Sequence, residues 1–422
     1  MSSTSHGDWV AWAICAATLA AIMIRPWRAS EAWCACLGAG VLVITRLLSP
    51  ADAAAAVLQG TDVYLFLTGM MMLADLARRE GLFDWLAAYA VRHCRGSAAR
   101  LFGLVYLVGI LVTVFLSNDA TAVVLTPAVY AATRRAGAKP LPYLLICAFI
   151  ANAASFVLPI SNPANLVVYG SHMPRLSAWL AQFAVPSALS IAVTYGVLRY
   201  TQRSALAEPI PATLEPPALQ AGAALAAAGI AATGIVLLVA SALDWALGLP
   251  TFIAGLLTAL VVLVRGRRSP WPLLGEISWS VLFLVAGLFV LARTIETTGL
   301  LAPVAALLVK GAASAPQMTS AATGSAAAVA SNLANNLPVG LLSGSLARGA
   351  HLTPHLTGAL LIGVDLGPNL SVTGSLATLL WLTALRREGQ SIGAWEFLAL
   401  GSLVMPPALI AALAAFGWLG GS

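Results

Sequence analysis

A long apolar run of the sequence is interrupted by Asp365-Leu366-Gly367-Pro368-Asn369-Leu370-Ser371-Val372-Thr373-Gly374-Ser375. Proline lacks an amide donor and clashes with the turn before it, so a helix that enters this stretch must break there. A second apolar run is interrupted in the same way by Pro159-Ile160-Ser161-Asn162-Pro163-Ala164-Asn165. The two ends of a broken helix present N–H and C=O groups that supply partial charge without an ionised side chain. We therefore predict two broken helices whose ends face a polar site.

The surroundings of these breaks are those of a membrane protein. Of the 422 residues, 60% are hydrophobic and 9% are charged, whereas about a quarter of the residues of soluble domains are charged. The apolar runs approach or reach the roughly 20 residues that a helix needs to cross ~30 Å of hydrocarbon. They are Trp9–Ile24, Trp33–Leu48, Leu101–Leu116, Ala178–Leu198, Ala221–Leu243, Thr251–Val264, Val281–Leu291 and Ala394–Trp418. No basic residue precedes the first run, so we interpret it as a retained helix and not as a signal peptide.

The segment from Arg100 to Lys139 has basic residues at both ends and the polar stretch Ser117-Asn118-Asp119-Ala120-Thr121 in its middle. This pattern is typical of a re-entrant hairpin that enters and leaves on the same side of the membrane. Non-helical backbone at such a tip is tolerated only where protein or a water-filled cavity surrounds it. We therefore expect the tip to face the broken helices.

The pattern recurs in the second half of the chain. Gly69 and Gly81 precede Gly287 and Gly299 by 218 residues, and Asn118-Asp119 precedes Asn335-Asn336 by 217. An odd number of predicted crossings separates the copies, so the second copy is inverted and its hairpin, around Ser331–Pro338, enters from the other side. We predict an all-α polytopic membrane protein of two inverted repeats, each with a re-entrant hairpin and a broken transmembrane helix, with about 10 full spans plus the two hairpins.

These repeats define the expected organisation of the chain. Residues 1–199 form the N-terminal transmembrane half with its hairpin at about 100–134, and residues 218–422 form the C-terminal half with its hairpin at about 318–348. Residues 200–217 form a cytoplasmic linker. Positive charge marks the cytoplasmic side of inner-membrane proteins, and we place there the clusters that include Arg78, Arg92, Arg134, Arg199, Arg265 and Arg386. Both termini are then periplasmic, together with Arg46, Arg175, Arg293, Lys310 and Arg348.

Two acids fall squarely inside the predicted membrane structure, Asp119 at the first tip and Asp365 at the second break. Ionisable groups at this depth are costly and therefore indicate function, so we predict that both carry protons. The structural alternatives are that Asp119 caps the hairpin and that Asp365 braces the break. Polar residues at the four interruptions are the predicted substrate ligands, although they could equally satisfy the interrupted backbone. They are Asn118, Thr121, Ser161, Asn162, Asn165, Asn332, Asn335, Asn336, Asn369, Ser371 and Thr373.

Motifs for other chemistry are missing from the sequence. It has no Walker A motif, no Gly-x-Ser-x-Gly and no His-Glu-x-x-His, so we predict neither a catalytic residue nor a cofactor, and expect a carrier driven by an ion gradient. The five histidines lack ligand partners at depth, and we expect no metal site. The five cysteines cannot all pair, and we expect no disulfide framework. The net charge of +6 sets orientation in the membrane and does not indicate nucleic acid as a partner.

Two quoted stretches carry a family resemblance. Ser117-Asn118-Asp119-Ala120-Thr121-Ala122-Val123-Val124-Leu125-Thr126-Pro127 and Gly363-Val364-Asp365-Leu366-Gly367-Pro368, continued by Gly374-Ser375-Leu376-Ala377-Thr378-Leu379-Leu380-Trp381, closely resemble the arsenite-efflux permease family ArsB of the ion transporter superfamily. Asn335-Asn336-Leu337-Pro338 is similar to the family's Asn-Asn-(Leu/Met)-Pro. Many members carry an acid where this chain has Asn152 and a lysine where it has Asn369.

The resemblance implies export of arsenite and antimonite, as neutral As(OH)3 and Sb(OH)3, in exchange for protons. It implies a small metalloid, protons and membrane lipid as partners, and it leaves open a homodimer and a separate cytoplasmic ATPase subunit. Two alternatives come from the same superfamily, a sodium-coupled dicarboxylate carrier and a sodium/proton antiporter. The dicarboxylate carriers have Ser-Asn-Thr at both tips, whereas this chain has Ser-Asn-Asp and Ser-Asn-Leu. An intramembrane enzyme or a structural subunit would need a nucleophile and base, or an exposed interaction domain, and the sequence offers neither.

Overall fold

The computed structural model describes residues 6–26, 29–170, 173–210 and 218–419, and within these ranges every regular element is a helix. Seven helices are long and apolar enough to cross a bilayer, and α3 (Pro50–Gln59) and α4 (Thr61–Arg79), bent by 43°, make an eighth candidate. The seven are α1 (His6–Ile24), α6 (Ala98–Phe115), α11 (Leu176–Thr201), α12 (Ala221–Ala242), α13 (Gly248–Gly266), α15 (Trp279–Thr297) and α21 (Ala394–Leu419). The predicted all-α polytopic fold is confirmed.

The internal duplication is visible in the helix boundaries. α4 and α15 each have 19 residues and begin at positions 61 and 279, and α11 and α21 each have 26 residues and begin at 176 and 394. The first arms of the two hairpins, α6 and α17 (Pro316–Ala334), begin at 98 and 316. All three pairs are separated by 218 residues, which is the spacing of the paired glycines.

The paired glycines have the same structural roles in both copies. Gly81 and Gly299 adopt φ of 76° and 69° just after α4 and α15, a left-handed conformation that glycine adopts without strain. Gly69 and Gly287 lie at helix crossings, where an added Cβ atom would be 2.6 Å from the Thr251 carbonyl oxygen and 2.8 Å from the Ala35 carbonyl carbon, respectively. Small residues at these crossings let the helix backbones approach closely.

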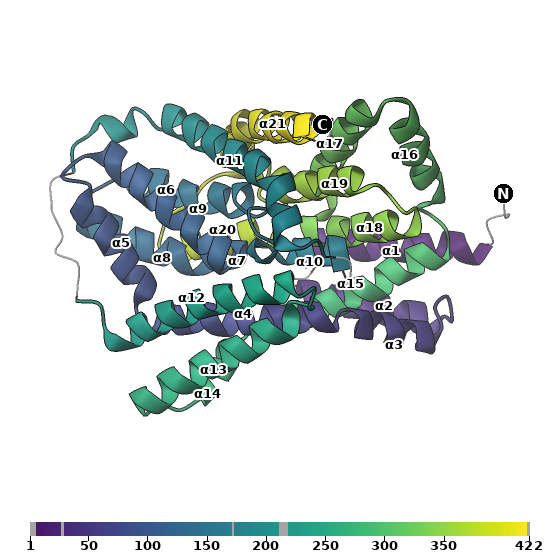
Figure 1. The fold of residues 1–422 in the computed structure, drawn as a ribbon, viewed down its shortest axis with the longest axis horizontal. Coiled ribbons are helices and arrows are strands. Elements are labelled where there is room, and N and C mark those ends of the chain that lie inside the picture. Colours follow the sequence, from purple (N-terminus) through teal and green to yellow (C-terminus); the bar gives the residue numbers. More distant parts are fainter. Residues whose placement is uncertain (1–5, 27–28, 171–172, 211–217, 420–422) are drawn as a thin grey trace.

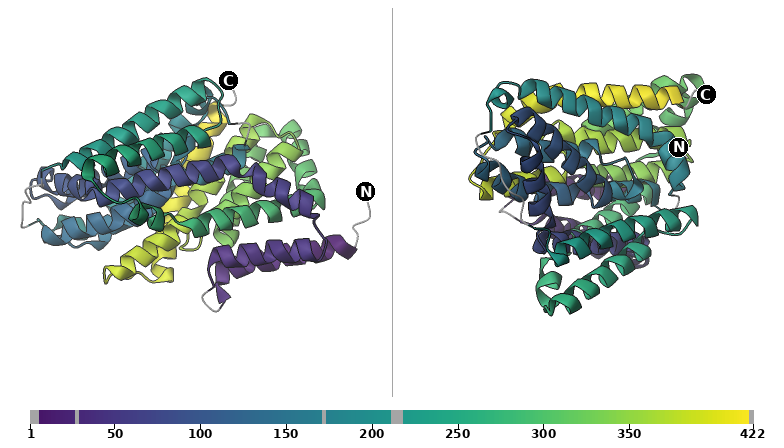
Figure 2. Two further views of the ribbon diagram at one scale, coloured as in Figure 1. Left: turned by 90° about the horizontal axis from the view of Figure 1, so that it is seen from below. Right: turned by 60° about the vertical axis from the view of Figure 1, so that its left-hand side comes forward.

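The helices form two groups, visible as lower and upper layers in Figure 1 and again in the right-hand view of Figure 2. In the frame group α4 and α12 pack on α13, and α1 and α15 pack on α2. In the hairpin group α11 packs on α21, α17 on α19, α10 on α18, and α6 on α9. The elements introduced here are α2 (Glu31–Ile44), α9 (Leu141–Ala153), α10 (Pro163–Tyr169), α18 (Asn336–Gly349), α19 (Pro354–Leu366) and α20 (Leu376–Arg387).

The second arm of the first hairpin is irregular. A short helix α7 (Asn118–Ala120) leads into a π-helical turn at Thr121–Leu125 and then into α8 (Thr126–Arg135). π-helical turns are rare and frequently lie at functional sites. The irregular backbone follows the tip directly, as expected for a hairpin whose tip is surrounded by protein.

The two hairpin tips align one residue away from the predicted pairing. Ser117 caps α7 and Asn335 caps α18, so the tips are 218 residues apart and not 217. Asn118 therefore corresponds to Asn336, and Asp119 corresponds to Leu337. The carboxyl group at the first tip has an apolar counterpart in the second repeat.

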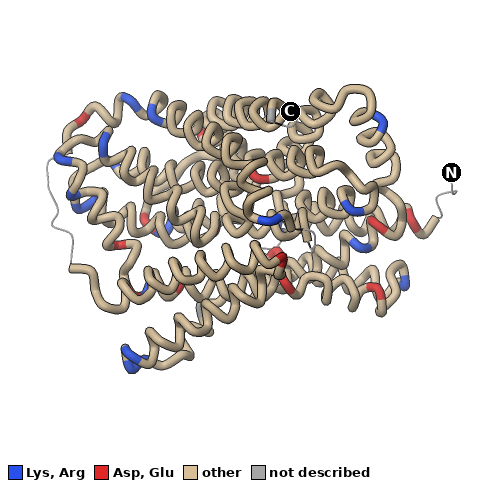
Figure 3. The backbone as a smooth tube through the Cα atoms, viewed as in Figure 1, with Lys and Arg blue, Asp and Glu red and all other residues tan. Residues whose placement is uncertain are grey.

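The Lys and Arg residues gather mostly toward one end of the molecule, at the left of Figure 3. The linker predicted at 200–217 starts at this end, where the Ile210 amide donates to the Gly96 carbonyl at 2.9 Å. Residues 211–217 of that linker and Arg28 lie outside the described residues. Two amphipathic helices flank the hairpins: α5 (Leu82–His93) buries one face, whereas α16 (Ala302–Ser314), its counterpart, buries none of its described residues.

Candidate functional site

The second break is held by Asn332, which lies in the last turn of α17. Its Nδ2 donates to the Gly367 carbonyl at 2.8 Å, and its Oδ1 accepts from the Ser371 hydroxyl at 2.8 Å. The Thr373 hydroxyl donates to the Asn332 carbonyl at 3.3 Å. Because Asn332, Ser371 and Thr373 are only partly buried, their polar groups can exchange these bonds for bonds to a solute.

The second hairpin tip is bonded to the same break. The Asn336 amide donates to the Gly374 carbonyl at 2.9 Å. Asn335 has φ of 69° and ψ of 149°, a conformation outside the left-handed helical region that residues with a side chain rarely adopt. Its Oδ1 accepts from the Leu337 amide at 3.3 Å and so caps α18. The tip and the break of the second repeat thus form one polar unit.

The first break is closed by its own side chains and by the first hairpin. The Asn165 Nδ2 atom donates to the carbonyls of Ser155 and Leu158 at 2.9 and 3.2 Å, and the Ser161 hydroxyl donates to the Val114 carbonyl of α6 at 3.2 Å. Asn165 and Ser161 are fully buried. They satisfy interrupted backbone, which is the structural role that the sequence left open for them.

The first tip is held by local bonds. The Asn118 Oδ1 atom accepts from the Asp119 amide at 2.9 Å, and the Ser117 hydroxyl oxygen accepts from the Ala120 amide at 3.3 Å. The Thr121 and Thr113 hydroxyls are 2.8 Å apart in the buried turn that follows. Asp119 is partly exposed as a residue, and among the described residues nothing bonds or pairs with its carboxylate.

Buried amides join the two breaks across the repeats. Asn162 caps α10 by accepting from the Ala164 amide at 3.0 Å, and its Nδ2 donates to Asp365 Oδ1 at 2.8 Å. The Asn152 Nδ2 atom donates to Asn369 Oδ1 at 3.1 Å, and Asn369 donates to the Phe149 carbonyl at 3.0 Å. The two broken helices therefore meet through neutral side chains and one carboxyl group.

Helix geometry directs the Asp365 side chain into this junction. Gly363 and Gly367 face α17, where a Cβ atom on either would be 2.0 and 2.4 Å from the carbonyl oxygens of Gly324 and Ala328. Asp365 lies midway between them, so its side chain projects from the opposite face of the helix. Its Oδ2 atom is buried and has no hydrogen-bond partner among the described residues. Contrary to prediction, the break begins after Leu366, and Asp365 is in the last turn of α19.

Residues that sequence reasoning missed include Asn152, Ser375 and Thr378. In the sequence Asn152 stands out only as a departure from the family pattern, yet its Nδ2 lies 3.1 Å from Asn369 and 3.4 Å from the Thr378 hydroxyl. Ser375 caps α20 by accepting from the Thr378 amide at 3.1 Å. The contacts of Asn152 could have been expected from its position in the otherwise apolar α9, because a buried polar side chain requires a hydrogen-bond partner.

We expect Asn162→Ala to weaken the junction more than the loss of a helix cap alone. The substitution removes the cap of α10 and leaves Asp365 Oδ1 without its donor, so the cost is about 2–4 kcal/mol when a cap and a buried hydrogen bond to a carboxyl group are lost together. Ser97→Ala, which removes only the cap of α6, is the matched control. Thermal unfolding in detergent measures both, and equal shifts in Tm would contradict the importance of the Asn162–Asp365 contact.

Comparison with known proteins agrees with this architecture. Residues 10–388 match the family model described as CitMHS, citrate transporter. The chain is 26% identical over 429 aligned positions to the arsenical pump membrane protein of Escherichia coli (strain K12), covering 96% of this chain and 97% of the relative. It is 27% identical over 421 positions to the arsenical pump membrane protein of Yersinia enterocolitica, covering 94% and 96%.

A solved structure shows the same fold. The Alcanivorax borkumensis YdaH transporter, whose structure has been described as having an unusual topology, superposes with a TM-score of 0.59 at 16% identity and covers 99% of this chain and 98% of its own. The family model spans nearly the whole chain. This protein is a multi-pass membrane transporter of the ArsB/CitMHS family.

Proposed function

We propose that this transporter exports arsenite and antimonite, as the neutral hydroxides As(OH)3 and Sb(OH)3, in exchange for protons. It would act in the inner membrane with both termini in the periplasm. The observation that carries the proposal is the neutral junction between the two breaks. Within the described part of the chain, its hydrogen bonds run between amides, hydroxyls, backbone groups and the Asp365 carboxyl group, and none involves Lys or Arg. Relatives over nearly the full length are named arsenical pump membrane proteins.

This chemistry suits an uncharged trihydroxy solute. Such a solute needs hydrogen-bond donors and acceptors and no fixed countercharge. Asn332, Ser371 and Thr373 offer both and are partly exposed. A citrate trianion would instead have to enter beside two carboxyl groups without a basic partner, at a cost that unpaired buried charge makes high. The neutral solute is therefore favoured over citrate.

The two carboxyl groups are the proposed proton carriers. Asp365 lies at the junction of the breaks, and Asp119 lies at the first tip, where no described residue pairs with it. An ionisable residue within the membrane that has no countercharge points to a proton pathway. We assign the exchanged protons to these two groups and the contacts with the solute to the amides and hydroxyls of the tips and breaks.

The substrate assignment is tested in everted membrane vesicles, in which export from the cell becomes uptake. With the vesicle interior acidified, the expected result is accumulation of arsenite, competition by antimonite and no accumulation of labelled citrate. Accumulation of citrate without arsenite would overturn the assignment and favour a carboxylate carrier. Vesicles that carry the Asn332→Ala, Ser371→Ala double variant should take up arsenite with a raised KM if these side chains contact the solute.

A further inference from the structure

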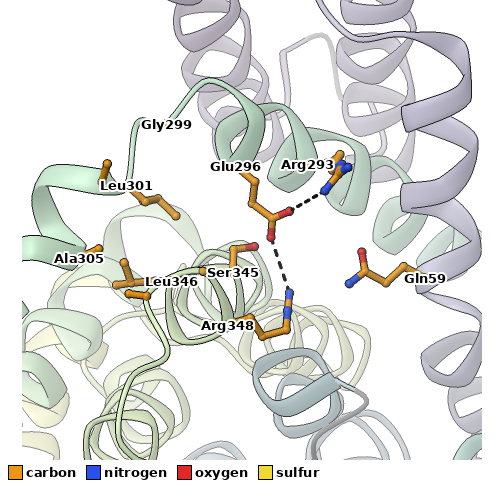
Figure 4. A pocket seen from close by; sticks show the side chains of 12 residues that line it. Gln59, Arg293, Glu296, Gly299, Leu301, Ala305, Ser345, Leu346 and Arg348 are labelled. Carbon is orange, nitrogen blue, oxygen red and sulfur yellow. Dashed lines mark ion pairs between the residues drawn. The ribbon is translucent and has the colours of Figure 1, made fainter. Parts of the chain in front are cut away.

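A cavity of about 580 Å³ lies away from the breaks, between α15, α16, the C-terminal end of α18 and the end of α3 (Figure 4). Its lining includes Arg293 and Glu296 of α15, Arg348 of α18 and Gln59 of α3. These elements lie toward the end of the molecule opposite the main gathering of Lys and Arg (Figures 1 and 3). On the proposed orientation, the cavity opens to the periplasmic side.

Glu296 is placed between two arginines in this cavity. Its Oε2 lies 3.6 Å from Arg293 Nη1, and its Oε1 lies 3.8 Å from Arg348 Nη2. Arg293 also pairs with Asp52 of α3 at 3.3 Å. The Arg348 and Glu296 side chains are 26% and 27% exposed, so water reaches the pair. A hydrated ion pair contributes little to the large free energy of folding, but a contribution of that size can shift an equilibrium between two folded states severalfold.

The Arg348–Glu296 pair joins the two helix groups. Glu296 belongs to α15 of the frame group, and Arg348 belongs to α18, which starts at the second hairpin tip. Arg348 also reaches the end of the first broken helix, since a Cβ atom on Gly170, the residue that ends α10, would lie 3.3 Å from Arg348 Nη1. Arg348 of α18 thus lies beside the residue that ends α10 and faces an acid of the frame.

Arg348 also lines three cavities. Besides the cavity of about 580 Å³, it lines one of about 320 Å³ beside Asp62 and Leu166 and one of about 380 Å³ beside Tyr169 and Thr357. It is the single residue shared by the described linings of all three. A movement of this side chain away from Glu296 would therefore change the lining of all three cavities.

We propose that the Arg348–Glu296 pair is the outer latch of this transporter. It holds α18, which packs on α10, against α15 and must separate when the breaks become open to the periplasmic side. Arg348 is a positioning residue in this role and makes no contact with the solute. The role of a latch rests on the proposed transport function, but the effect of the ion pair on access to the break can be tested without any substrate.

The test measures access to the second break from the outer face. A reporter cysteine replaces Val372, a partly buried residue of the break that is assigned no ligand role, in right-side-out vesicles treated with a membrane-impermeant maleimide. Four of the native cysteines are buried and Cys36 is half-buried, so the protein without the reporter supplies the background. Glu296→Gln and Arg348→Ala are each expected to raise the labelling rate about fivefold, the change that an ion pair of ordinary strength makes in a two-state equilibrium.

Charge exchange provides the decisive control. Glu296→Arg or Arg348→Glu alone should raise labelling, and the two together should return it to the rate of the reporter alone. The pair Lys139–Glu208, 2.5 Å apart and exposed at the opposite face, is exchanged in the same way and should change nothing. The latch would be overturned by an unchanged labelling rate in Glu296→Gln. It would also be overturned if the double exchange labelled as fast as the single changes. If Arg348→Ala lowers Tm, its labelling rate no longer tests the latch. The labelling rate of Glu296→Gln then decides, because this variant keeps Arg348 beside α10.

The outcome is independent of the substrate. Labelling requires no arsenite, so a latch that responds as expected would stand even if the vesicles failed to transport arsenite. Conversely, arsenite transport with no response of the labelling would leave the proposed function intact and reject the latch alone.

Discussion

Vesicles that carry Asp365→Asn should lose gradient-driven accumulation of arsenite. If one proton is exchanged for each solute, a gradient of about one pH unit supports roughly tenfold accumulation, and the variant should fall to a ratio of about one. The reason is local: an asparagine at this position keeps an oxygen that can accept from Asn162 Nδ2, as Asp365 Oδ1 does at 2.8 Å, but its side chain cannot take up and release a proton. The measurement is the ratio of internal to external arsenite at steady state.

The matched control is Asp84→Asn, because Asp84 is an exposed acid of α5 away from the breaks. We expect wild-type accumulation in this variant. A Tm for Asp365→Asn close to that of the wild type would show that the loss is one of coupling and not of folding. Wild-type accumulation in Asp365→Asn would remove this residue from the proton pathway.

Among glycine-to-alanine substitutions in the hairpin group, Gly363→Ala should cause the largest loss of stability. A Cβ atom there would lie 2.0 Å from the Gly324 carbonyl oxygen and 2.9 Å from the Ala327 Cβ atom. The contact is with the backbone of α17, so relief requires the two helices to separate, and overpacking of this kind costs about 1–3 kcal/mol. The same shift would move Asp365 relative to Asn162. We expect a lower Tm in detergent together with reduced arsenite uptake.

Gly196→Ala makes the identical chemical change at a glycine of α11, where the position that a Cβ atom would occupy has no neighbouring atom within 4 Å. Alanine is preferred to glycine within a helix by about 1 kcal/mol, so Tm should stay constant or rise. Equal losses of Tm in the two variants would contradict the assignment of Gly363 to a close crossing of helices.

Much of this architecture could be read from the sequence because its signals are local. Prolines 159, 163 and 368 mark the two breaks, although α9 ends earlier than predicted, at Ala153, and Pro163 begins α10. Glycines at 69 and 287 mark equivalent crossings. The 218-residue spacing then relates the two copies. The alignment of the tips could not be settled this way, because Ser117 and Asn335 are equivalent by their capping role and not by identity.

The contacts between the two repeats could not be predicted from the sequence. Asn152 and Asn369 are far apart in the chain, and only the crossing of α9 with the second break brings their side chains to 3.1 Å. Likewise, both structural and ligand roles were open for the predicted asparagines. Asn165 and Asn332 both donate to backbone carbonyls at a break, but Asn165 is fully buried and Asn332 is partly exposed. This difference between two asparagines at the breaks depends on tertiary geometry that no local pattern encodes.

The most direct test of the central claim is proton movement driven by arsenite in proteoliposomes that contain the purified protein and a pH-sensitive dye inside. In sodium-free buffer, an imposed arsenite gradient should change the internal pH with wild-type protein, and the change should be lost in Asp119→Asn. Proton movement driven by sodium without arsenite would instead identify a sodium/proton antiporter. A full response in Asp119→Asn would contradict the role of the first hairpin tip, and no response to arsenite in the wild type would contradict proton-coupled metalloid export itself.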